Sequence, residues 1–260
     1  MSELARRQVL TGMALSTVAG LPLAAVLADP RLARAAAASL EDVSITTAGG
    51  HPVTAALAVP ARTPAPAIVL IHEWWGLNDQ IKSMAAELAK EGYVALAVDL
   101  YGGNMTDQPD QARALMQAVD AAVATDTLVS WIEWLRRRDG VNGKIGTIGW
   151  CFGGGWSLDA SIATPVDATV VYYGRVNQPA EKLKALESPV LGQFASRDQW
   201  INREMVGGFE QAMAESGKSV SVHWYEADHA FANPTQARYD EADASLAWQR
   251  TLAFFKENLR

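Results

Sequence analysis

The sequence predicts an α/β fold in which a mostly parallel, doubly wound sheet carries helices on both faces. Two observations predict it: short apolar segments rich in β-branched residues recur along the chain, and segments with helical apolar spacing separate them. The chain has 260 residues, of which 49% are hydrophobic, so it is long enough to bury one large core. We therefore expect one main domain, with ligand chemistry at the carboxyl ends of its parallel strands.

The predicted strands fall into two groups. Segments 43–47 and 53–59 alternate in polarity around a Gly-Gly-His-Pro turn at 49–52, which predicts a hairpin at an antiparallel edge. The continuous apolar run 67–71 is typical of a strand that is buried on both faces of a parallel sheet. Five more short segments predict further strands, at 94–98, 145–148, 168–172, 190–194 and 220–224.

Helical spacing of apolar residues is clearest at 80–90, 128–137 and 240–259, and we expect the last of these helices to cover one face of the sheet. The region 108–138 leaves two alternatives open, one bent helix or two helices. The residues at 125–127, Thr-Asp-Thr, are where the helical periodicity weakens.

The first 38 residues have the order of an export signal. Arg6 and Arg7 precede an Ala-rich apolar run at 9–28, and small residues follow at 35–38. A twin-arginine pair of this kind directs folded proteins across the bacterial inner membrane. We therefore expect the twin-arginine export machinery as a partner and the periplasm as the location.

On this interpretation the signal comprises residues 1–38, and residues 39–260 form a catalytic domain without a stable membrane anchor. A retained anchor is the alternative, but Gly12, Gly20 and Pro22 make the segment a poor permanent membrane helix. We expect the mature protein to be a monomer.

Charge and cysteine content exclude several classes of function. Without residues 1–38 the chain carries 18 basic and 27 acidic side chains, and such a surface repels nucleic acid. The one basic run, at 136–138, is expected to form the solvated end of a helix. Cys151 is the only cysteine, so no intrachain disulfide can form. The spacing of the four histidines predicts no metal site; they are His51, His72, His223 and His229.

Cys151 occupies the centre of a Gly-x-Cys-x-Gly motif, between Gly149 and Gly153, that follows a predicted strand and precedes a helix. This is the pattern of a nucleophile elbow, in which glycines let the backbone turn sharply and the central side chain projects into a cleft. The start of a helix favours a thiolate, the nucleophilic form. A buried cysteine in a Gly-rich turn is the alternative interpretation.

An elbow of this type needs an acid and a histidine further along the chain, in that order. His229 lies in a loop after the last predicted strand, whereas His223 lies inside that strand and is interpreted as structural. Asp198 follows the strand at 190–194, at the place where the fold puts its orienting acid. Asp228 is adjacent to His229, which makes the required geometry awkward. The alternative for Asp198 is a capping or surface role.

The loop after the strand at 67–71 is predicted to complete the site. In this fold one backbone N–H donor to an oxyanion comes from that loop and a second from the residue after the nucleophile, which indicates Trp74 and Phe152. Glu73 is expensive to bury unless it is hydrogen-bonded, so beside a thiol it indicates a tuning or gating role. A cap for the following helix is the alternative.

These motifs, taken together, resemble the dienelactone hydrolase family, a cysteine-nucleophile branch of the α/β-hydrolase superfamily. The resemblance covers about residues 40–260. It is carried by His72-Glu73-Trp74-Trp75-Gly76, Asp99-Leu100-Tyr101, Gly149-Trp150-Cys151-Phe152-Gly153-Gly154, Tyr172-Tyr173-Gly174, His223-Trp224-Tyr225 and His229-Ala230-Phe231.

The resemblance implies hydrolysis of a lactone or small carboxylic ester, of the carboxymethylenebutenolidase type. A Cys151, His229 and Asp198 triad would work through an acyl-enzyme, without metal or organic cofactor. Glu73 would hold the resting thiol away from His229 until substrate binds. Four more residues would contact substrate: Trp75, Tyr101, Tyr173 and Phe231.

One departure from the family concerns the substrate carboxylate. Family members hold it with two arginines, but the corresponding places here are Gly103 and Asn233. Losing two bidentate partners removes a strong carboxylate anchor, so the usual dienelactone is not assured as substrate. Arg175 and Arg197 are alternative anchors. Six tryptophans near the predicted site segments offer an aromatic pocket, with most expected to serve packing: Trp74, Trp75, Trp150, Trp156, Trp200 and Trp224.

Two other functions stay open. Another cysteine-elbow hydrolase would act on esters, thioesters or peptides, and a non-catalytic binding protein can share the same fold. A redox sensor is disfavoured because the chain has no resolving cysteine.

Overall fold

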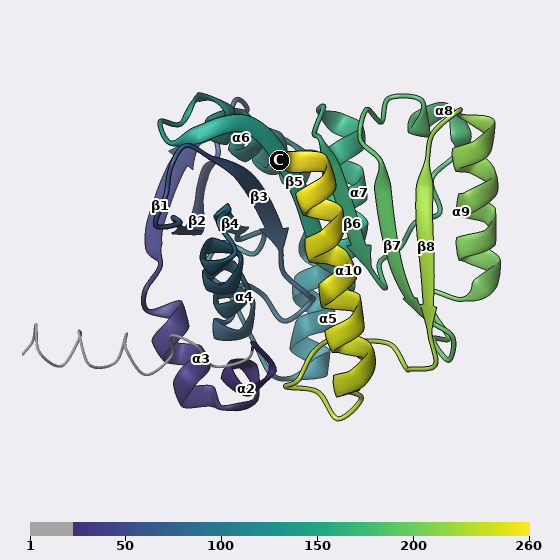
Figure 1. The fold of residues 1–260 in the computed structure, drawn as a ribbon, viewed down its shortest axis with the longest axis horizontal. Coiled ribbons are helices and arrows are strands. Elements are labelled where there is room, and N and C mark those ends of the chain that lie inside the picture. The colour runs from purple at the N-terminus through teal and green to yellow at the C-terminus, as the bar shows by residue number, and fades with distance from the viewer. Residues whose placement is uncertain (1–22) are drawn as a thin grey trace, which may run out of the picture.

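An eight-stranded sheet forms the centre of the computed structural model, which describes residues 23–260 (Figure 1). The strands are β1 (Glu41–Thr46), β2 (Pro52–Ala58), β3 (Ala65–Ile71), β4 (Val94–Val98), β5 (Val141–Trp150), β6 (Ala168–Tyr172), β7 (Val190–Ala195) and β8 (Val220–Tyr225). Their order is β1-β2-β4-β3-β5-β6-β7-β8, in which β1, β2 and β4 pair antiparallel and all other neighbours pair parallel. The predicted mostly parallel sheet with an antiparallel edge is confirmed.

Helices cover both faces of this sheet, as predicted. They are α2 (Leu23–Ala28), α3 (Pro30–Ala37), α4 (Asp79–Lys90), α5 (Pro109–Ala118), α6 (Ala121–Arg137), α7 (Phe152–Ala163), α8 (Ala180–Leu183), α9 (Arg203–Glu215) and α10 (Glu241–Leu259). The alternation of side chains along β3 explains the two layers. Ile68 and Leu70 pack with α4 and α10, which lie on one side of the sheet in Figure 1, whereas Val69 and Ile71 pack with α6.

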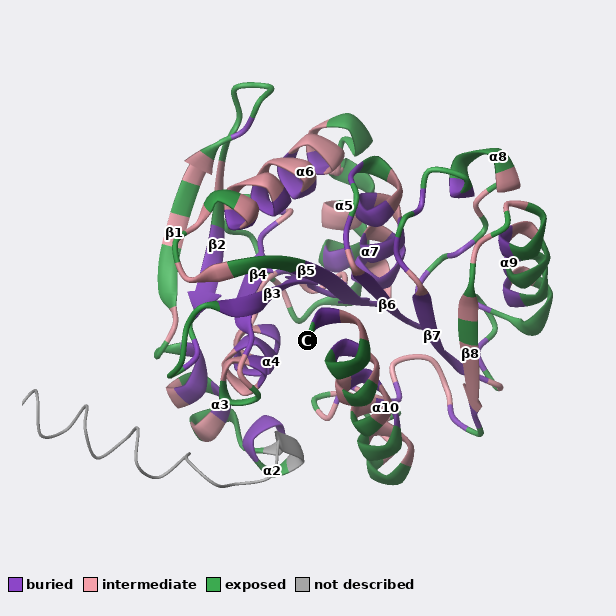
Figure 2. Ribbon diagram, turned by 45° about the horizontal axis from the view of Figure 1, so that its top comes forward, coloured by how far each residue is buried: buried purple, intermediate pink, exposed green. Residues whose placement is uncertain are grey.

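Burial of both faces accounts for the composition of the central strands. Every residue of β3, β4, β6 and β7 is buried, and Figure 2 shows these strands in purple. Strands covered on both faces read as continuous apolar runs because neither face meets water. The edge strand β1 keeps an alternating pattern of exposure instead.

The region 108–138 forms two helices, and the break lies at Val119 and Asp120, not at 125–127. Asp120 starts the second helix because its carboxylate accepts hydrogen bonds from the N–H groups of Ala122 and Val123. Thr125 and Thr127 lie within α6, where their hydroxyls donate to carbonyl oxygens four residues earlier and so do not interrupt the helix. The sequence analysis placed the weak point at the threonines and did not identify Asp120 as the N-cap of the second helix.

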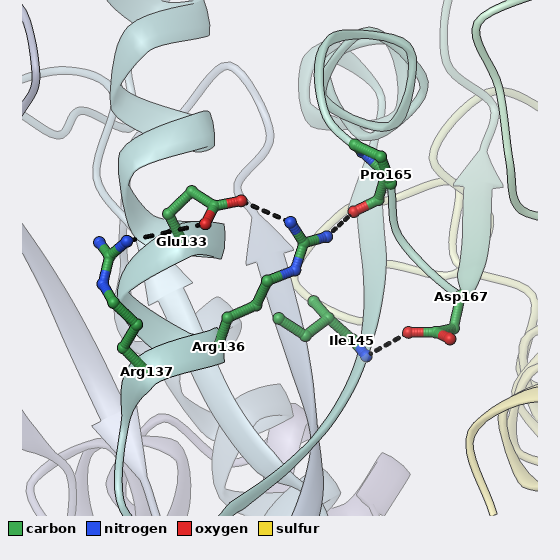
Figure 3. A network of polar contacts seen from close by, with 6 residues as sticks. All are labelled: Glu133, Arg136, Arg137, Ile145, Pro165 and Asp167. Atoms are coloured by element: carbon green, nitrogen blue, oxygen red, sulfur yellow. Dashed lines mark hydrogen bonds and ion pairs between the residues drawn. The ribbon is translucent and has the colours of Figure 1, made fainter.

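The basic run at the end of α6 belongs to the fold, as Figure 3 shows. Arg137 lies 3.7 Å from Glu133, and Arg136 contacts both Glu133 and the carbonyl oxygen of Pro165. Both arginines occupy the last turn of α6, where positive charge complements the helix dipole. The prediction of a helix end is therefore confirmed.

The predicted export signal falls partly outside the described residues, since Arg6, Arg7 and the rest of 1–22 are not described. Its remaining part forms α2 and α3, which pack against α4. The hydroxyl of Ser83 on α4 donates to the carbonyl oxygen of Ala33 at 2.9 Å, and Arg34 lies 3.7 Å from Asp79. Across residues 23–260, no helix combines the length and apolarity that crossing a membrane requires.

Candidate active site

Loops at one edge of the sheet bring the predicted site residues together. Strands β3 to β8 are all mutually parallel, so their carboxyl ends share this edge. The loops after β3, β5, β7 and β8 carry Glu73, Cys151, Asp198 and His229 respectively. These residues are as much as 156 positions apart in sequence, counted from Glu73 to His229.

Cys151 is the single residue between the end of β5 and the start of α7. Its φ of 53° and ψ of −115° lie outside the regions that side-chain-bearing residues favour, which is the strained turn of a nucleophile elbow. A Cβ at Gly149 would lie 2.0 Å from the carbonyl oxygen of Gly153, so glycine is required there. The predicted elbow geometry is confirmed, and the Cys151 side chain is half-buried.

Asp198 is held rigidly and faces His229. One of its carboxylate oxygens accepts from the N–H groups of Trp200 and Ile201, at 2.9 and 3.0 Å. The other lies 2.6 Å from Nδ1 of His229. Burial alone would raise the pKa of Asp198, but the hydrogen bond and charge of His229, with the two N–H donors, lower it overall. Asp198 thus caps the turn that follows it with one oxygen and contacts His229 with the other.

The same contact tunes His229. Burial lowers the pKa of a histidine, but hydrogen bonds to Asp198 and Cys151, and the charges of both, outweigh it and raise the pKa of His229 to about 10. Because Nδ1 faces Asp198, Nε2 is left for Cys151. The raised pKa favours the imidazolium form of His229 at neutral pH.

Glu73 is fully buried and hydrogen-bonded. The hydroxyl of Tyr173 donates to one carboxyl oxygen at 3.3 Å, and the side-chain amide of Asn233 donates to the other. Burial raises the pKa of Glu73, against the lowering effects of Asn233 and His229. Asn78, not Glu73, caps α4, so the alternative of a helix-cap role for Glu73 is wrong.

Asn233 stands where the family places an arginine, and the structure gives it a defined partner. Its Oδ1 accepts from the N–H and the hydroxyl of Thr235, at 2.9 and 2.7 Å. Because those donors fix the oxygen, the NH₂ group must face Glu73. A neutral amide thus takes the position of a positive charge beside a buried carboxyl.

Sequence reasoning missed the role of His72, although it heads the motif at 72–76. Its Nε2 accepts from the N–H of Leu100 at 3.1 Å, so Nδ1 carries the proton that is donated to the carbonyl oxygen of Glu73 at 2.6 Å. Burial lowers the pKa of His72, in keeping with this neutral tautomer. A buried histidine that ties two loops together fixes the backbone from which Glu73 and Trp74 project.

The residues predicted to contact substrate take different positions. Tyr101 is buried against Phe152, with ring centroids 5.5 Å apart, and its hydroxyl has no hydrogen-bond partner among residues 23–260. Burial, then the charge of Cys151, raise the pKa of that hydroxyl. Tyr173 meets the His229 ring edge-on at 5.1 Å, and Phe231 is fully buried behind Tyr173. Tyr101 therefore keeps a buried hydroxyl without a partner among the described residues, whereas Phe231 packs behind Tyr173 in the core.

The predicted oxyanion donors lie on either side of the elbow. Phe152 is the first residue of α7, so its N–H is one of those that a helix leaves without an intrahelical acceptor. Trp74 lies in the turn closed by the N–H of Gly76 and the carbonyl of Glu73, and its ring packs edge-on against Trp75. Trp74, Trp75 and Phe152 are all partly exposed residues.

Each of the alternative carboxylate anchors lies near a carboxylate of the protein itself. Arg175 lies 3.5 Å from Asp159, and Arg197 lies 3.6 Å from Asp228. Within the described part of the chain, no group of three or more His, Cys, Asp or Glu side chains is placed to hold a metal ion.

Known proteins share both this sequence and this fold. The model of the dienelactone hydrolase family matches residues 53–259. A carboxymethylenebutenolidase of Pseudomonas putida is 31% identical over 229 residues, which cover 82% of this chain and 95% of that protein. The crystal structure of a Klebsiella pneumoniae protein assigned as a dienelactone hydrolase has a TM-score of 0.75 at 27% identity, and the match covers 84% of this chain and 99% of that one.

More distant enzymes share the fold alone. An acylaminoacyl peptidase of Pyrococcus horikoshii has a TM-score of 0.68 at 14% identity, and the match covers 85% of this chain but 41% of the peptidase. The family model and the Pseudomonas relative both span most of this chain. The chain therefore belongs to the dienelactone hydrolase family, and it is a hydrolase with the α/β-hydrolase fold.

Proposed function

We propose that this protein hydrolyses a lactone or small carboxylic ester through Cys151, His229 and Asp198, with a covalent acyl-enzyme intermediate. The observation that carries the proposal is the 2.6 Å contact between His229 and a buried Asp198, beside a cysteine in an elbow turn. A nucleophile, its base and the group that orients the base are the parts that acyl transfer needs. The carboxymethylenebutenolidase relatives support a small lactone as substrate.

The reaction begins with attack of the Cys151 thiolate on the carbonyl carbon, which forms a carbon–sulfur bond and places the carbonyl electron pair on oxygen. The N–H groups of Trp74 and Phe152 stabilise that oxyanion. Collapse of the tetrahedral intermediate breaks the bond to the leaving oxygen, which takes the Nε2 proton of His229. In a lactone this step opens the ring.

Water completes the cycle. Neutral His229 accepts a proton from water as it attacks the thioester, the thiolate leaves, and the carboxylic acid product departs. Asp198 keeps the imidazole in one tautomer and stabilises the imidazolium, which is present in the free enzyme and re-forms once per cycle when water gives up its proton.

For Glu73 we propose tuning of the local charge and not blocking of the thiol. Its two oxygens contact Tyr173 and Asn233, and Cys151 contributes to the raised pKa of His229. These contacts favour a thiol that is already paired with His229 in the free enzyme. We expect iodoacetamide to alkylate Cys151 rapidly at neutral pH without substrate. A thiol that reacts only when a substrate analogue is bound would contradict this role.

The proposed function is tested by incubating the purified protein with 4-nitrophenyl acetate and, in parallel, with a dienelactone. We expect a burst of nitrophenol, one acetyl group on the peptide that contains Cys151, and turnover of at least one compound. Cys151→Ala is the control for background hydrolysis. A folded protein that gains no acyl group from either compound would overturn the proposal and favour a binding role.

The raised pKa of His229 predicts an alkaline limit to activity. His229 must be protonated to donate to the leaving oxygen, so kcat/KM is expected to stay level through neutral pH and to fall as pH passes about 10. In Asp198→Asn the carboxylate charge that raises the pKa of His229 is lost, while burial still lowers this pKa. We expect the alkaline limb to move to lower pH and kcat to fall by roughly 10²- to 10⁴-fold. Full pH profiles of both proteins check this, and an unmoved limb would show that Asp198 does not control His229.

We also propose export through the twin-arginine route, which the order of Arg6, Arg7 and the apolar run at 9–28 supports. Cell fractionation combined with N-terminal sequencing tests it. The mature protein should lie in the periplasm, and Arg6→Lys with Arg7→Lys should hold it in the cytoplasm. An intact N-terminus in the cytoplasm of cells with the unaltered chain would contradict export.

A further inference from the structure

Trp200 is an exposed aromatic side chain at the edge of the site. Its backbone N–H donates to Asp198, and the residue is 61% exposed although its ring meets the His229 ring edge-on, with centroids 5.3 Å apart. Large aromatic side chains in water are costly, so one that is left open beside a reacting imidazole is placed to contact a ligand. Trp200 is therefore open to solvent directly beside His229.

Arg238 lies over the same indole. Its guanidinium carbon is 5.5 Å from the centre of the Trp200 ring. The segment that carries it is anchored, because Gln236 and Asp240 donate backbone hydrogen bonds to the carbonyls of Asn233 and Phe231. Among residues 23–260 no carboxylate forms an ion pair with Arg238, whereas Arg175 and Arg197 are both paired.

The chemistry of His229 fixes which part of the substrate reaches this pair. In the proposed reaction His229 gives its proton to the leaving oxygen, so the alcohol part of the substrate must lie beside His229 and Trp200. A planar alcohol part would stack on the indole, and a carboxylate on it would meet the guanidinium. The protein has a net charge of −7, so a cation beside Trp200 that forms no ion pair among residues 23–260 is a local exception.

We propose that Trp200 and Arg238 form a subsite for the alcohol part of the substrate, and that it selects a planar group bearing a carboxylate. The proposal rests on the proposed function and names its substrate class. The anion is bound on the leaving-group side, from the segment after His229, and not at Gly103 or Asn233. Arg238 is the only lysine or arginine within ten residues of His229 in the sequence, which is the signal that points to it.

Two matched pairs of esters test the subsite. 3-Acetoxybenzoate and its methyl ester differ by a carboxylate on the alcohol side, whereas 4-nitrophenyl hydrogen glutarate and its methyl ester differ by one on the acyl side. For each pair the quantity measured is the ratio of kcat/KM for the anion to that for its methyl ester. A ratio cancels general losses of activity in a variant.

In Arg238→Gln we expect the alcohol-side ratio to fall about five- to tenfold, mainly through KM, as for a partly exposed charge pair. High salt should lower the same ratio in the unaltered enzyme. Trp200→Leu should lower kcat/KM for 3-acetoxybenzoate and for its methyl ester, relative to kcat/KM for vinyl acetate, which has no aromatic group. Arg138→Gln is the matched control, because Arg138 lies over Trp134 at the end of α6, at the opposite edge of the sheet.

The possible results distinguish a failure of the subsite from a failure of the proposed function. Cysteine-dependent turnover with an alcohol-side ratio that Arg238→Gln does not change would overturn the subsite and leave the proposed function standing. A fall in the acyl-side ratio alone would place the anion on the wrong side and overturn it as well. If none of the four esters is hydrolysed in a Cys151-dependent way, the proposed function fails and the subsite fails with it.

Discussion

Replacing Cys151 by alanine is expected to lower kcat for ester hydrolysis by roughly four to six orders of magnitude while the protein stays folded. Every covalent step of the proposed reaction passes through the sulfur atom, and Cys151 is the only cysteine of the chain. The side chain is half-buried and occupies the N-cap position of α7 without a capping hydrogen bond. Its loss therefore removes chemistry and little packing.

Backbone strain provides the control for this prediction. Alanine and cysteine meet the same steric cost at a φ of 53°, whereas glycine meets almost none. Cys151→Gly should be equally inactive but more stable than Cys151→Ala by about 1 kcal/mol. Burst and steady-state kinetics with 4-nitrophenyl acetate, together with urea unfolding, measure both quantities. Residual activity within about tenfold of the unaltered enzyme in a folded Cys151→Ala protein would exclude Cys151 as nucleophile.

Gly153→Ala is expected to destabilise the fold by about 3 kcal/mol or more and to reduce activity strongly. A Cβ at Gly153 would lie 2.2 Å from the carbonyl oxygen of Ile71 and 2.5 Å from that of His72. Both are backbone atoms at the end of β3. A backbone atom cannot move aside as the end of a flexible side chain can. Relief of the clash must separate α7 from β3, which displaces the loop that carries Glu73 and Trp74.

Gly207 offers a matched control for this substitution. It also lies within a helix, α9, but a Cβ there would have no atom within 4 Å. Gly207→Ala is expected to stabilise the protein by about 0.5–1 kcal/mol, because alanine favours the helix and restricts the unfolded chain. Urea unfolding of the two variants should therefore give changes of opposite sign. Equal stability of Gly153→Ala and the unaltered protein would show that helix and strand are not in such close contact.

Much of the fold was predictable because its signals are local. The segments 94–98 and 168–172 match β4 and β6 to the residue, since strands buried on both faces are continuous apolar runs. The elbow was readable because its motif is local, and the backbone contact that requires glycine at Gly149 is with Gly153. The contacts that require glycine at Gly153 are with Ile71 and His72 and could not be read from the motif. The break between α5 and α6 was misplaced, since the cap at Asp120 is a single side chain whereas two threonines drew attention.

Residues far apart in sequence account for what could not be predicted. Asn233 contacts Glu73 across 160 positions, and Arg238 lies over Trp200. No periodicity encodes such pairs, since each depends on where two loops meet after the sheet has formed. The motif around Phe231 predicted a contact with substrate, but the structure buries this side chain fully in the core.

The sequence by itself determined the layered fold, the elbow around Cys151 and the order of the nucleophile, the acid and the histidine. Only the tertiary structure decided that Glu73 meets a neutral amide in place of an arginine. It also decided that Arg175 and Arg197 lie near carboxylates, whereas Arg238 has no carboxylate partner among residues 23–260. The physical reason is the distance along the sequence between the residues that interact. Strands and turns are specified by contacts between near neighbours, whereas the charge around a reacting group is set by every loop that the parallel sheet brings to one edge.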